Sequence, residues 1–421
     1  MAKKLFSTTL FLIYVVGCSK VDNNTFEESI GTCDCDAINF VAQTTKATTN
    51  ELDSMKSDAN GFVVYGVEIN SSSWYDYLDG NKYIYNSTSE TWEWEDDKTP
   101  SWPLPFNQMN FYALYPDSAE GFTISTTPTS SIVGDIVVQQ SILDQTDYLA
   151  AASGDVMTKP STGVLPLQFT HIMSKISFSV LQDEGILTII RQLGIENIIS
   201  EGSYDYMTST WYNLSNSNLT SFDDYVGSSG PFAKYGVADQ VDPIRIDGHD
   251  LMLIPQKGGD EDGQTPVWDG SITDDNSGDF APSGAYISIR YRTSVNDDSE
   301  DLVGYAFREN TTTETEWTNG YYHSTYRNGG RYNGPLYIKA AFRLTPELLD
   351  WEAGSEYDYT LQLNQIGGIY LSEYYYDVDG TNTKIRVKGR PCVGDPVIST
   401  NISADISVVG WTPVQYSIYS L

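Results

Sequence analysis

The chain has 421 residues and a formal net charge of −33, from 24 Lys and Arg against 57 Asp and Glu. This length is enough for two or three domains. The surplus of carboxylates repels phosphate groups and anionic lipid headgroups, so the charge argues against nucleic acid as a partner and against a membrane association driven by basic residues.

The composition predicts a folded, mainly β protein. Hydrophobic residues make up 40% of the chain and charged residues 19%, so the acidity reflects a shortage of Lys and Arg within a globular composition. Aromatic residues make up 13%, and they accompany 34 Gly and 17 Pro. Aromatic side chains suit half-buried pleated surfaces, and Gly and Pro suit the turns between strands.

The first residues have the pattern of a bacterial lipoprotein signal. Lys3 and Lys4 precede an apolar run at residues 5–16, which is too short to span a bilayer as a mature helix but fits a signal peptide. Small residues then precede Cys18, as in a lipobox, whose cysteine is acylated and becomes the first mature residue. The alternative is a chance cysteine after an ordinary signal peptide. We expect a signal peptide over residues 1–17 and lipidation at Cys18.

A polar stretch over residues 18–36 follows, and we expect it to tether the lipidated end to the folded body. Short strands begin immediately afterwards. Ile38, Phe40 and Ala42 occupy alternate positions, which predicts a strand with one apolar face. A Thr-rich polar loop separates this first strand from the strands that follow it.

Further strands, separated by turn signals, predict a β-sandwich domain over residues 37–180. One of these turn signals is Asp79-Gly80-Asn81. The pattern indicates strands at residues 62–67, 83–85, 92–94, 110–115, 122–126, 148–152 and 165–180.

A second set of strands with longer loops predicts a second β-sandwich domain over residues 181–421. Acidic residues crowd the loop at 258–279, for which weak Ca²⁺ binding and a solvated insertion are both open, the insertion being favoured. The one helical segment is expected after Thr345, with Pro346 at its first position. The strands of this half are expected at residues 187–199, 250–255, 285–293, 302–307, 337–344, 357–363, 384–387 and 401–409.

Patterns typical of enzymes are missing from the sequence. It has no Gly-Lys dipeptide for a phosphate-binding loop and no Gly-x-Ser-x-Gly nucleophile elbow. Paired carboxylates of a glycosidase cannot be judged by counting. His171 lies in a strand pattern, and we expect a structural residue at a strand edge or domain junction. The sequence therefore predicts no enzyme, no catalytic residue and no cofactor.

Cysteine spacing also predicts no metal site. Cys33 and Cys35 form a single Cys-x-Cys pair, and the distant Cys392 cannot complete a structural zinc site. A disulfide from Cys392 to one of the pair and free thiols both remain open. Aromatic clusters at residues 74–77 and 374–376 have the chemistry to stack on sugars, although cross-strand pairs or core positions are commoner in a β-rich chain.

Short motifs follow one another along the whole mature chain. They are Ile38-Asn39-Phe40 with Lys46 in the next loop, Trp102-Pro103, Met109-Asn110-Phe111-Tyr112, Gln145-Thr146-Asp147-Tyr148, Leu167-x-Phe169-x-His171-x-x-Ser174-Lys175, Met252-Leu253-Ile254-Pro255-Gln256, Trp351-x-x-Gly354-x-x-Tyr357-x-Tyr359 and Ile402-x-Ala404-x-Ile406-x-Val408-x-x-Trp411. Each is modest alone, but their order is specific. Together with the lipobox, they resemble the fimbrillin family of Gram-negative type V pili.

The resemblance implies two tandem transthyretin-like β-sandwich domains without catalytic activity. It also implies export to the outer membrane as a lipoprotein. In stalk subunits of the family, a surface protease removes the first strand, and the C-terminal segment of the next subunit fills the groove. By this resemblance, Ile38, Phe40 and Ala42 mark the displaced first strand. The expected partners are other fimbrial subunits, joined by β-strand addition, and outer-membrane lipid through Cys18 before maturation.

The C-terminal tail has the period of a donor strand. Val414, Tyr416 and Ile418 alternate with other residues after Pro413. An edge strand of its own subunit is an equally open interpretation. Both interpretations place the tail at the edge of a sheet, because a strand of matching period satisfies the unpaired backbone groups there.

One departure from the family concerns proteolysis. The maturation cut of the family follows an arginine, whereas the first arginine here is Arg191. Lys46 and Lys56 are therefore the candidate cleavage sites. Without a cut, Cys18 keeps its lipid, and the protein is an anchor, a cap or a stand-alone surface lipoprotein that binds a host or bacterial surface glycan or protein.

Overall fold

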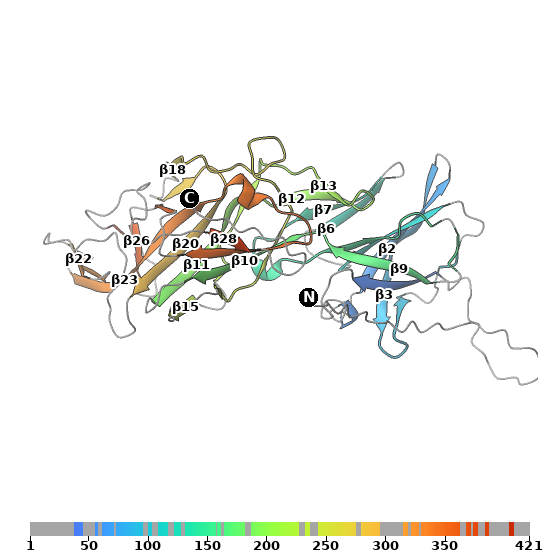
Figure 1. Ribbon diagram of the computed structural model, residues 1–421, viewed down its shortest axis with the longest axis horizontal. Coiled ribbons are helices and arrows are strands. Elements are labelled where there is room, and N and C mark those ends of the chain that lie inside the picture. The colour runs from blue at the N-terminus through green and yellow to red at the C-terminus, as the bar shows by residue number, and fades with distance from the viewer. Residues whose placement is uncertain are drawn as a thin grey trace, which may run out of the picture.

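The described part of the chain folds mainly into β-strands in the computed structural model, as the composition predicts. Figure 1 shows an elongated molecule, with β2 (Phe62–Asn70) and β9 (Val164–His171) toward one end and β20 (Tyr286–Ser294) and β23 (Gly330–Arg343) toward the other. None of the helices in the described part is long and apolar enough to cross a membrane. The structure describes residues 38–44, 55–57, 61–70, 73–95, 100–102, 108–116, 122–127, 131–156, 158–160, 164–181, 187–226, 232–235, 243–274, 279–294, 315–318, 321–327, 330–362, 368–371, 374–377, 384–386 and 404–407.

The first strands form a seven-stranded sheet in the order β1-β9-β8-β5-β2-β3-β4. The pair β1 and β9 is parallel, and the other neighbours are antiparallel. The strands not yet located are β1 (Asn39–Thr44), β3 (Ser73–Asn86), β4 (Thr91–Trp94), β5 (Met109–Tyr115) and β8 (Leu149–Ala152).

This sheet curls around an aromatic core. Its two outermost strands, β1 and β4, stand at opposite ends of the strand order and nevertheless approach each other. On the enclosed face, the ring of Phe62 lies edge-on to Trp92 at 4.8 Å and to Phe169 at 5.2 Å between centroids. Edge-to-face packing of this kind adds to the stabilisation that burial of each ring provides. We call this cluster the barrel core.

The predicted turn at Asp79-Gly80-Asn81 is wrong, because β3 runs through these residues. Gly80 has φ 70°, and a Cβ there would lie 2.9 Å from the hydroxyl of Tyr65. The pairing of β3 with β2 shifts register at this point, from Asn81 opposite Val64 to Leu78 opposite Gly66. The Asp-Gly signal therefore marks a β-bulge with glycine in the left-handed region, a second common use of such a dipeptide.

A four-stranded sheet connects the two halves of the sequence. Its order is β13-β12-β7-β6, and Glu201 of β12 lies opposite Val137 of β7. A hydrogen-bonded sheet therefore crosses the boundary predicted near residue 180, and the division into two domains stays a prediction. The strands are β6 (Phe122–Thr127), β7 (Ser131–Val137), β12 (Glu201–Asp205) and β13 (Thr210–Tyr212).

Two larger sheets follow. One has the order β14-β11-β20-β23-β22-β21, with β15 on β11, β25 and β26 on β23, and β27 on β26; the other has the order β16-β10-β24-β28, with β17 on β10. The strands are β10 (Ser174–Leu181), β11 (Leu187–Ile199), β14 (Leu219–Phe222), β15 (Phe232–Tyr235), β16 (Ile244–Arg245), β17 (Leu251–Leu253), β21 (Thr315–Thr318), β22 (Tyr321–Arg327), β24 (Glu356–Gln362), β25 (Gly368–Tyr370), β26 (Tyr374–Asp377), β27 (Lys384–Arg386) and β28 (Ala404–Ser407).

Apolar side chains of these sheets form one large core. Phe178 of β10, Ile195 of β11 and Ile289 of β20 are buried in it. The same core includes Tyr112 and Leu114, which lie on the outer face of the seven-stranded sheet. The hydrophobic interior is therefore continuous from the N-terminal half of the sequence into the C-terminal half.

The predicted motif around Trp351 has a structural role. The indole nitrogen of Trp351 donates to the hydroxyl of Tyr359 at 2.9 Å, and that hydroxyl donates to the carbonyl of Leu348 at 2.5 Å. Leu348 belongs to the 3₁₀ helix η2 (Pro346–Leu349), which confirms the helical segment predicted after Thr345, although Thr345 makes no capping side-chain bond. The motif thus fastens η2 to β24. The prediction of a single helical segment is wrong, because the chain forms another 3₁₀ helix, η1 (Ile142–Asp144).

The acidic loop at 258–279 is anchored to the body. β18 (Ile272–Asp274) pairs with β19 (Phe280–Pro282), and the buried Trp268 packs in a small cluster with Tyr286 and Leu371. Among its described acidic residues, Asp260, Glu261, Asp262, Asp269 and Asp274 are exposed and Asp279 is partly exposed. Hydrogen bonds from Ser271 lower the pKa of Asp269. In the part of the chain that the structure describes, His, Cys, Asp and Glu form no group of three that could hold a metal ion.

Four charged side chains form a network on β10, β24 and the segment around β16. The ammonium of Lys175 lies 3.0 Å from Asp250 and 3.4 Å from Glu356, and the guanidinium of Arg245 lies 2.5 Å and 3.0 Å from the same two carboxylates. Glu356 and Lys175 are opposite each other in the parallel ladder. Two cations and two carboxylates therefore balance each other across three strands.

Asp358 is buried beside this network with hydroxyl partners. Ser177 and Ser179 donate to its carboxylate at 3.1 Å and 2.6 Å. Burial raises the pKa of Asp358, because the charged carboxylate loses water that two hydroxyl groups replace only in part. Folding therefore favours the protonated carboxyl group.

We predict that Asp358→Asn is at least as stable as the wild type at pH 7. The raised pKa means that the wild-type Asp358 loses stability as the pH rises from the ordinary Asp value through the folded-state value. Thermal denaturation from pH 3 to pH 8 is the measurement. The stability of the variant relative to the wild type should be largest at neutral pH and should fall to zero at the acidic end. A difference in stability that is smaller at pH 7 than at pH 3 contradicts this assignment.

Candidate functional site

β1 is the element that the sequence singles out, and it lies at the edge of the seven-stranded sheet. Ile38, Phe40 and Ala42 are 0%, 3% and 4% exposed, whereas Val41 between them is 36% exposed. The buried side chains are those that the alternation predicts. One face of the segment is thus wholly covered by the barrel core.

The backbone of β1 forms a parallel ladder with β9 over its whole length. Phe40 lies opposite Leu165, and Ala42 lies opposite Leu167. Both Leu165 and Leu167 are buried in the barrel core. Without β1, the edge of β9 would present unpaired N–H and C=O groups, and the core beside it would lose its cover.

Phe40 is the main apolar anchor of β1. Its ring centroid lies 5.0 Å from that of Tyr83 and 5.2 Å from that of Phe111, edge-on in both cases. Tyr83 comes from β3 and Phe111 from β5, so one side chain of β1 contacts two other strands of the barrel. Sequence reasoning did not identify Tyr83 as a partner, and its only signal was an aromatic residue in a predicted strand.

The start of β1 has two further contacts. The N–H of Ile38 donates to the carbonyl of Pro100 at 2.7 Å, and the hydroxyl of Tyr83 lies 3.5 Å from the carbonyl of Ile38. Burial raises the pKa of Tyr83 well above its ordinary value, so its hydroxyl stays a proton donor. Pro100 was not predicted to contact this strand, because no local pattern joins residues so far apart.

The candidate cleavage site at Lys56 is held against the body. Residues 55–57 form a helical turn, and Met55 is buried in the barrel core. The ammonium of Lys56 lies 5.2 Å from the ring centroid of Tyr85, as in a cation–π contact. A protease needs an extended, accessible segment, so cleavage after Lys56 requires this turn to open.

Several predicted residues lie outside the described residues. They are Cys18, Lys46, the cysteines Cys33, Cys35 and Cys392, and the donor-strand residues Val414, Tyr416 and Ile418. The strand predicted over residues 302–307 also lies outside them. The described strand nearest to the tail in sequence is β28, which pairs with β24 at the edge of its sheet.

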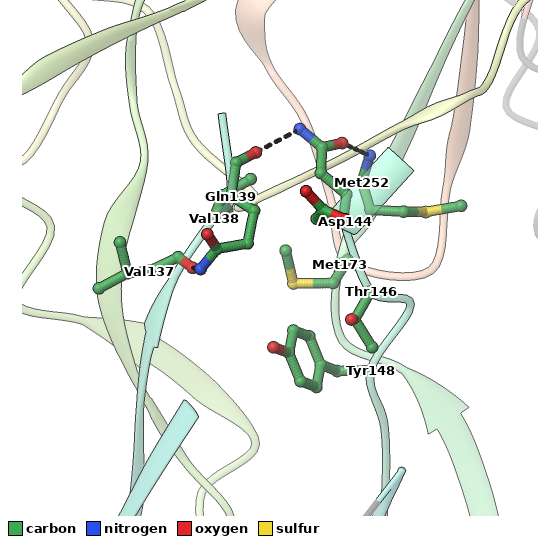
Figure 2. Close-up of a pocket in the computed structure, with 9 residues that line it drawn as sticks. Val137, Val138, Gln139, Asp144, Thr146, Tyr148, Met173 and Met252 are labelled. Carbon is green, nitrogen blue, oxygen red and sulfur yellow. Dashed lines mark hydrogen bonds between the residues drawn. The ribbon is translucent and has the colours of Figure 1, made fainter. Parts of the chain in front are cut away.

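A small pocket lies between the predicted halves of the chain (Figure 2). Gln145 crosses it, donating to the carbonyl of Gln139 at 3.0 Å and accepting from the N–H of Met252 at 2.8 Å. Tyr148 and Met173 also line the pocket. It encloses about 10 Å³, which is room for roughly one water molecule. The pocket is therefore a packing feature of the junction.

His171 has the structural position that its strand pattern predicts. It ends β9, and its Nδ1 atom lies 2.9 Å from the carboxylate of Asp147. The chain passes from the seven-stranded sheet to the sheet of β10 within the next few residues. The pair therefore fixes a sheet junction.

The two aromatic clusters considered for sugar binding lie in strands. Residues 74–77 belong to β3, and residues 374–376 belong to β26, which pairs with β23 and β27. The hydroxyl of Tyr77 donates to the carbonyl of Ser101. Tyr77 thus contacts a neighbouring segment of the chain.

Comparisons with known proteins show a family and solved structures to which the chain is similar. A sequence profile of fimbrillin-like proteins matches residues 45–374. The chain is similar to a fimbrial protein from Bacteroides vulgatus, with a TM-score of 0.53 and 13% identity over 89% of this chain and 99% of that one. It is also similar to a proposed cell adhesion protein from Bacteroides uniformis, with a TM-score of 0.40 and 13% identity over 89% and 98% of the two chains. The first similarity shows a shared fold, and no curated protein matches the sequence.

We predict that Phe40→Ala destabilises the full chain by about 3–5 kcal/mol, the usual cost of truncating a buried phenylalanine. Val41→Ala is the matched control, because Val41 is a neighbour in the same strand with an exposed side chain. It should change the free energy of unfolding by less than about 0.5 kcal/mol. Urea denaturation measures both. Equal effects would mean that β1 is not anchored through its buried face.

We further predict that Met55→Ala increases the rate of cleavage after Lys56 by at least about tenfold, because removing the buried side chain makes the helical turn easier to open. The experiment is limited digestion with a Lys-specific protease, followed by N-terminal sequencing of the products. In the wild type, a new N-terminus at Ser57 should form slowly. Rapid cleavage at this position in the wild type would show that the turn does not protect the bond.

Proposed function

The chain belongs to the fimbrillin-like family, and from this premise we propose that it is a structural and adhesive subunit of a cell-surface fimbrium. The observation that carries the proposal is β1, an edge strand with one buried apolar face. Such a strand fills a groove that a strand from another molecule would also fit. The role requires binding surfaces and stability, and it needs no catalytic residue, cofactor or metal.

In this proposal, subunits join by strand exchange. Loss of β1 uncovers the edge of β9 together with the apolar positions now held by Ile38, Phe40 and Ala42. An incoming strand restores the main-chain hydrogen bonds and buries the same surface. The restored main-chain hydrogen bonds and the buried apolar surface both favour assembly, because in the open subunit the edge of β9 is unpaired and the groove is exposed to water.

The C-terminal tail of a second copy is the proposed occupant. Residues 38–42 have the sequence Ile-Asn-Phe-Val-Ala, and residues 414–418 have the sequence Val-Gln-Tyr-Ser-Ile. Both place a β-branched aliphatic residue, a carboxamide and an aromatic ring in the same order. A tail that ran parallel to β9, as β1 does, would put Tyr416 in the position of Phe40. Ile418 is larger than Ala42, so the last position must widen slightly.

Export and anchoring complete the proposal. The signal peptide at residues 1–17 directs export, lipidated Cys18 holds the precursor in the outer membrane, and residues 18–36 form the tether. Cleavage after Lys46 would free the body from the lipid and release β1. We keep the division into domains at residues 37–180 and 181–421 as part of this proposal, with the sheet of β6, β7, β12 and β13 as the connection between them.

A second role follows if β1 is retained. The helical turn that holds Lys56 favours a precursor that resists cleavage after this lysine, and the absence of any arginine before Arg191 favours one that resists an arginine-specific protease. Such a protein would stay on the outer membrane through Cys18. It would act as an anchor, a cap or a glycan-binding or protein-binding surface lipoprotein of the same fold.

The deciding experiment compares oligomers before and after digestion with a Lys-specific protease. We predict ladders on denaturing gels only for digested protein with an intact tail, because the groove must be open and a donor strand present. Tyr416→Ala should reduce oligomers by at least about tenfold, the effect of losing a buried aromatic anchor. Tyr419→Ala is the matched control, since Tyr419 lies in the same tail on the alternate face and should retain assembly.

Two results would contradict assembly by this route. One is a digested protein that stays monomeric, and the other is an equal effect of the two tail substitutions. A monomer that begins at lipidated Cys18 on native cells, as shown by N-terminal sequencing and intact mass, would support the anchored role instead.

A further inference from the structure

The seam beside β1 is closed by a short segment, residues 100–102, which we call the strap. β1 and β4 are the two ends of the seven-stranded sheet, and they approach each other to close the barrel. On one side, β1 is hydrogen-bonded to β9 along its length. At its start, the N–H of Ile38 donates to the carbonyl of Pro100 at 2.7 Å. The strap therefore contacts β1 at the end where the chain enters the sheet.

The strap is fastened to the body of the barrel through two side chains. Trp102 is 4% exposed, and its ring lies 5.8 Å from Phe111, edge-on. Phe111 is also the ring on which Phe40 packs. The hydroxyl of Tyr77, from β3, donates to the carbonyl of Ser101. The strap thus has fixed points on β5 and β3.

The contact between the strap and β1 is suited to release. Pro100 has no N–H, so it offers β1 a carbonyl acceptor and cannot extend a two-sided ladder. Movement of the strap away from Ile38 breaks the hydrogen bond between Ile38 and Pro100. Conversely, while Trp102 and Tyr77 hold the strap in place, Ile38 stays bonded and the Phe40 ring stays covered by its neighbours.

We propose that the strap is a latch that sets how often β1 opens, with Tyr77 and Trp102 as its positioning residues. The inference rests on the proposed strand exchange for its biological meaning, since the groove that the latch guards is the one a donor strand would enter. Loosening the strap frees Ile38 first, and separation of β1 from β9 follows. A tight strap therefore keeps the unprocessed subunit closed.

Hydrogen exchange of the full-length chain tests the latch. Tyr77→Phe removes the hydroxyl that bonds Ser101 and leaves the ring. We expect the amides of β1 to exchange roughly fivefold faster, the effect of losing one ordinary hydrogen bond, while the amides of β5 keep their rate. Tyr85→Phe is the matched control, because it removes a hydroxyl from the same strand without contact to Ser101, and it should leave β1 unchanged. Trp102→Phe should also speed exchange of β1.

Three outcomes overturn the latch. They are an unchanged rate for β1 in Tyr77→Phe, an equal effect of Tyr85→Phe, and exchange of β1 only together with β5, which would mean that β1 never opens alone. These outcomes are independent of assembly. If ladders form but exchange does not respond to Tyr77→Phe, the latch fails and strand exchange stands. If exchange responds but digested protein never assembles, the latch stands and the proposed function fails.

Discussion

The packing of β5 on both of its faces is the constraint on which the rest of the structure depends. Phe111 and Ala113 face the barrel core, whereas Tyr112 and Leu114 belong to the large core shared with the C-terminal sheets. A strand buried on both faces tolerates almost no shift in register, because a slip of one residue would exchange the two sets of side chains. β5 therefore fixes the barrel relative to everything that packs outside it.

This arrangement separates β1 from the packing that holds the central strands together. Phe40 of β1 contacts Phe111 on the barrel side of β5. The outer side is covered by the four-stranded sheet and the large core, whose side chains do not include those of β1. Removal of β1 would thus open one groove while the central strands keep their second layer of packing, which is the condition a strand-exchanging subunit has to meet.

Local patterns predicted many strands because alternation depends on the pleat alone. Residues 187–199 were predicted as one strand, and β11 has these bounds. The single strand predicted over 165–180 is divided into β9 and β10. The buried apolar residues change from odd positions such as Phe169 to even ones such as Ile176 at the junction near His171. That change of phase was readable in the sequence. The Asp79-Gly80 bulge was not, because the same dipeptide serves turns and bulges.

The sequence by itself determined the β class, the alternation of Ile38, Phe40 and Ala42, and the resemblance to fimbrillins, since each depends on residue type and spacing along the chain. Only the tertiary structure decided that β1 pairs in parallel with β9, that Pro100 and Trp102 close the seam beside it, and that β7 pairs with β12 across residue 180. The contacts of β1 with β9, of Ile38 with Pro100 and of β7 with β12 join residues about 60 to 130 positions apart. Their partners are selected by the packing of a whole core, which no local period encodes.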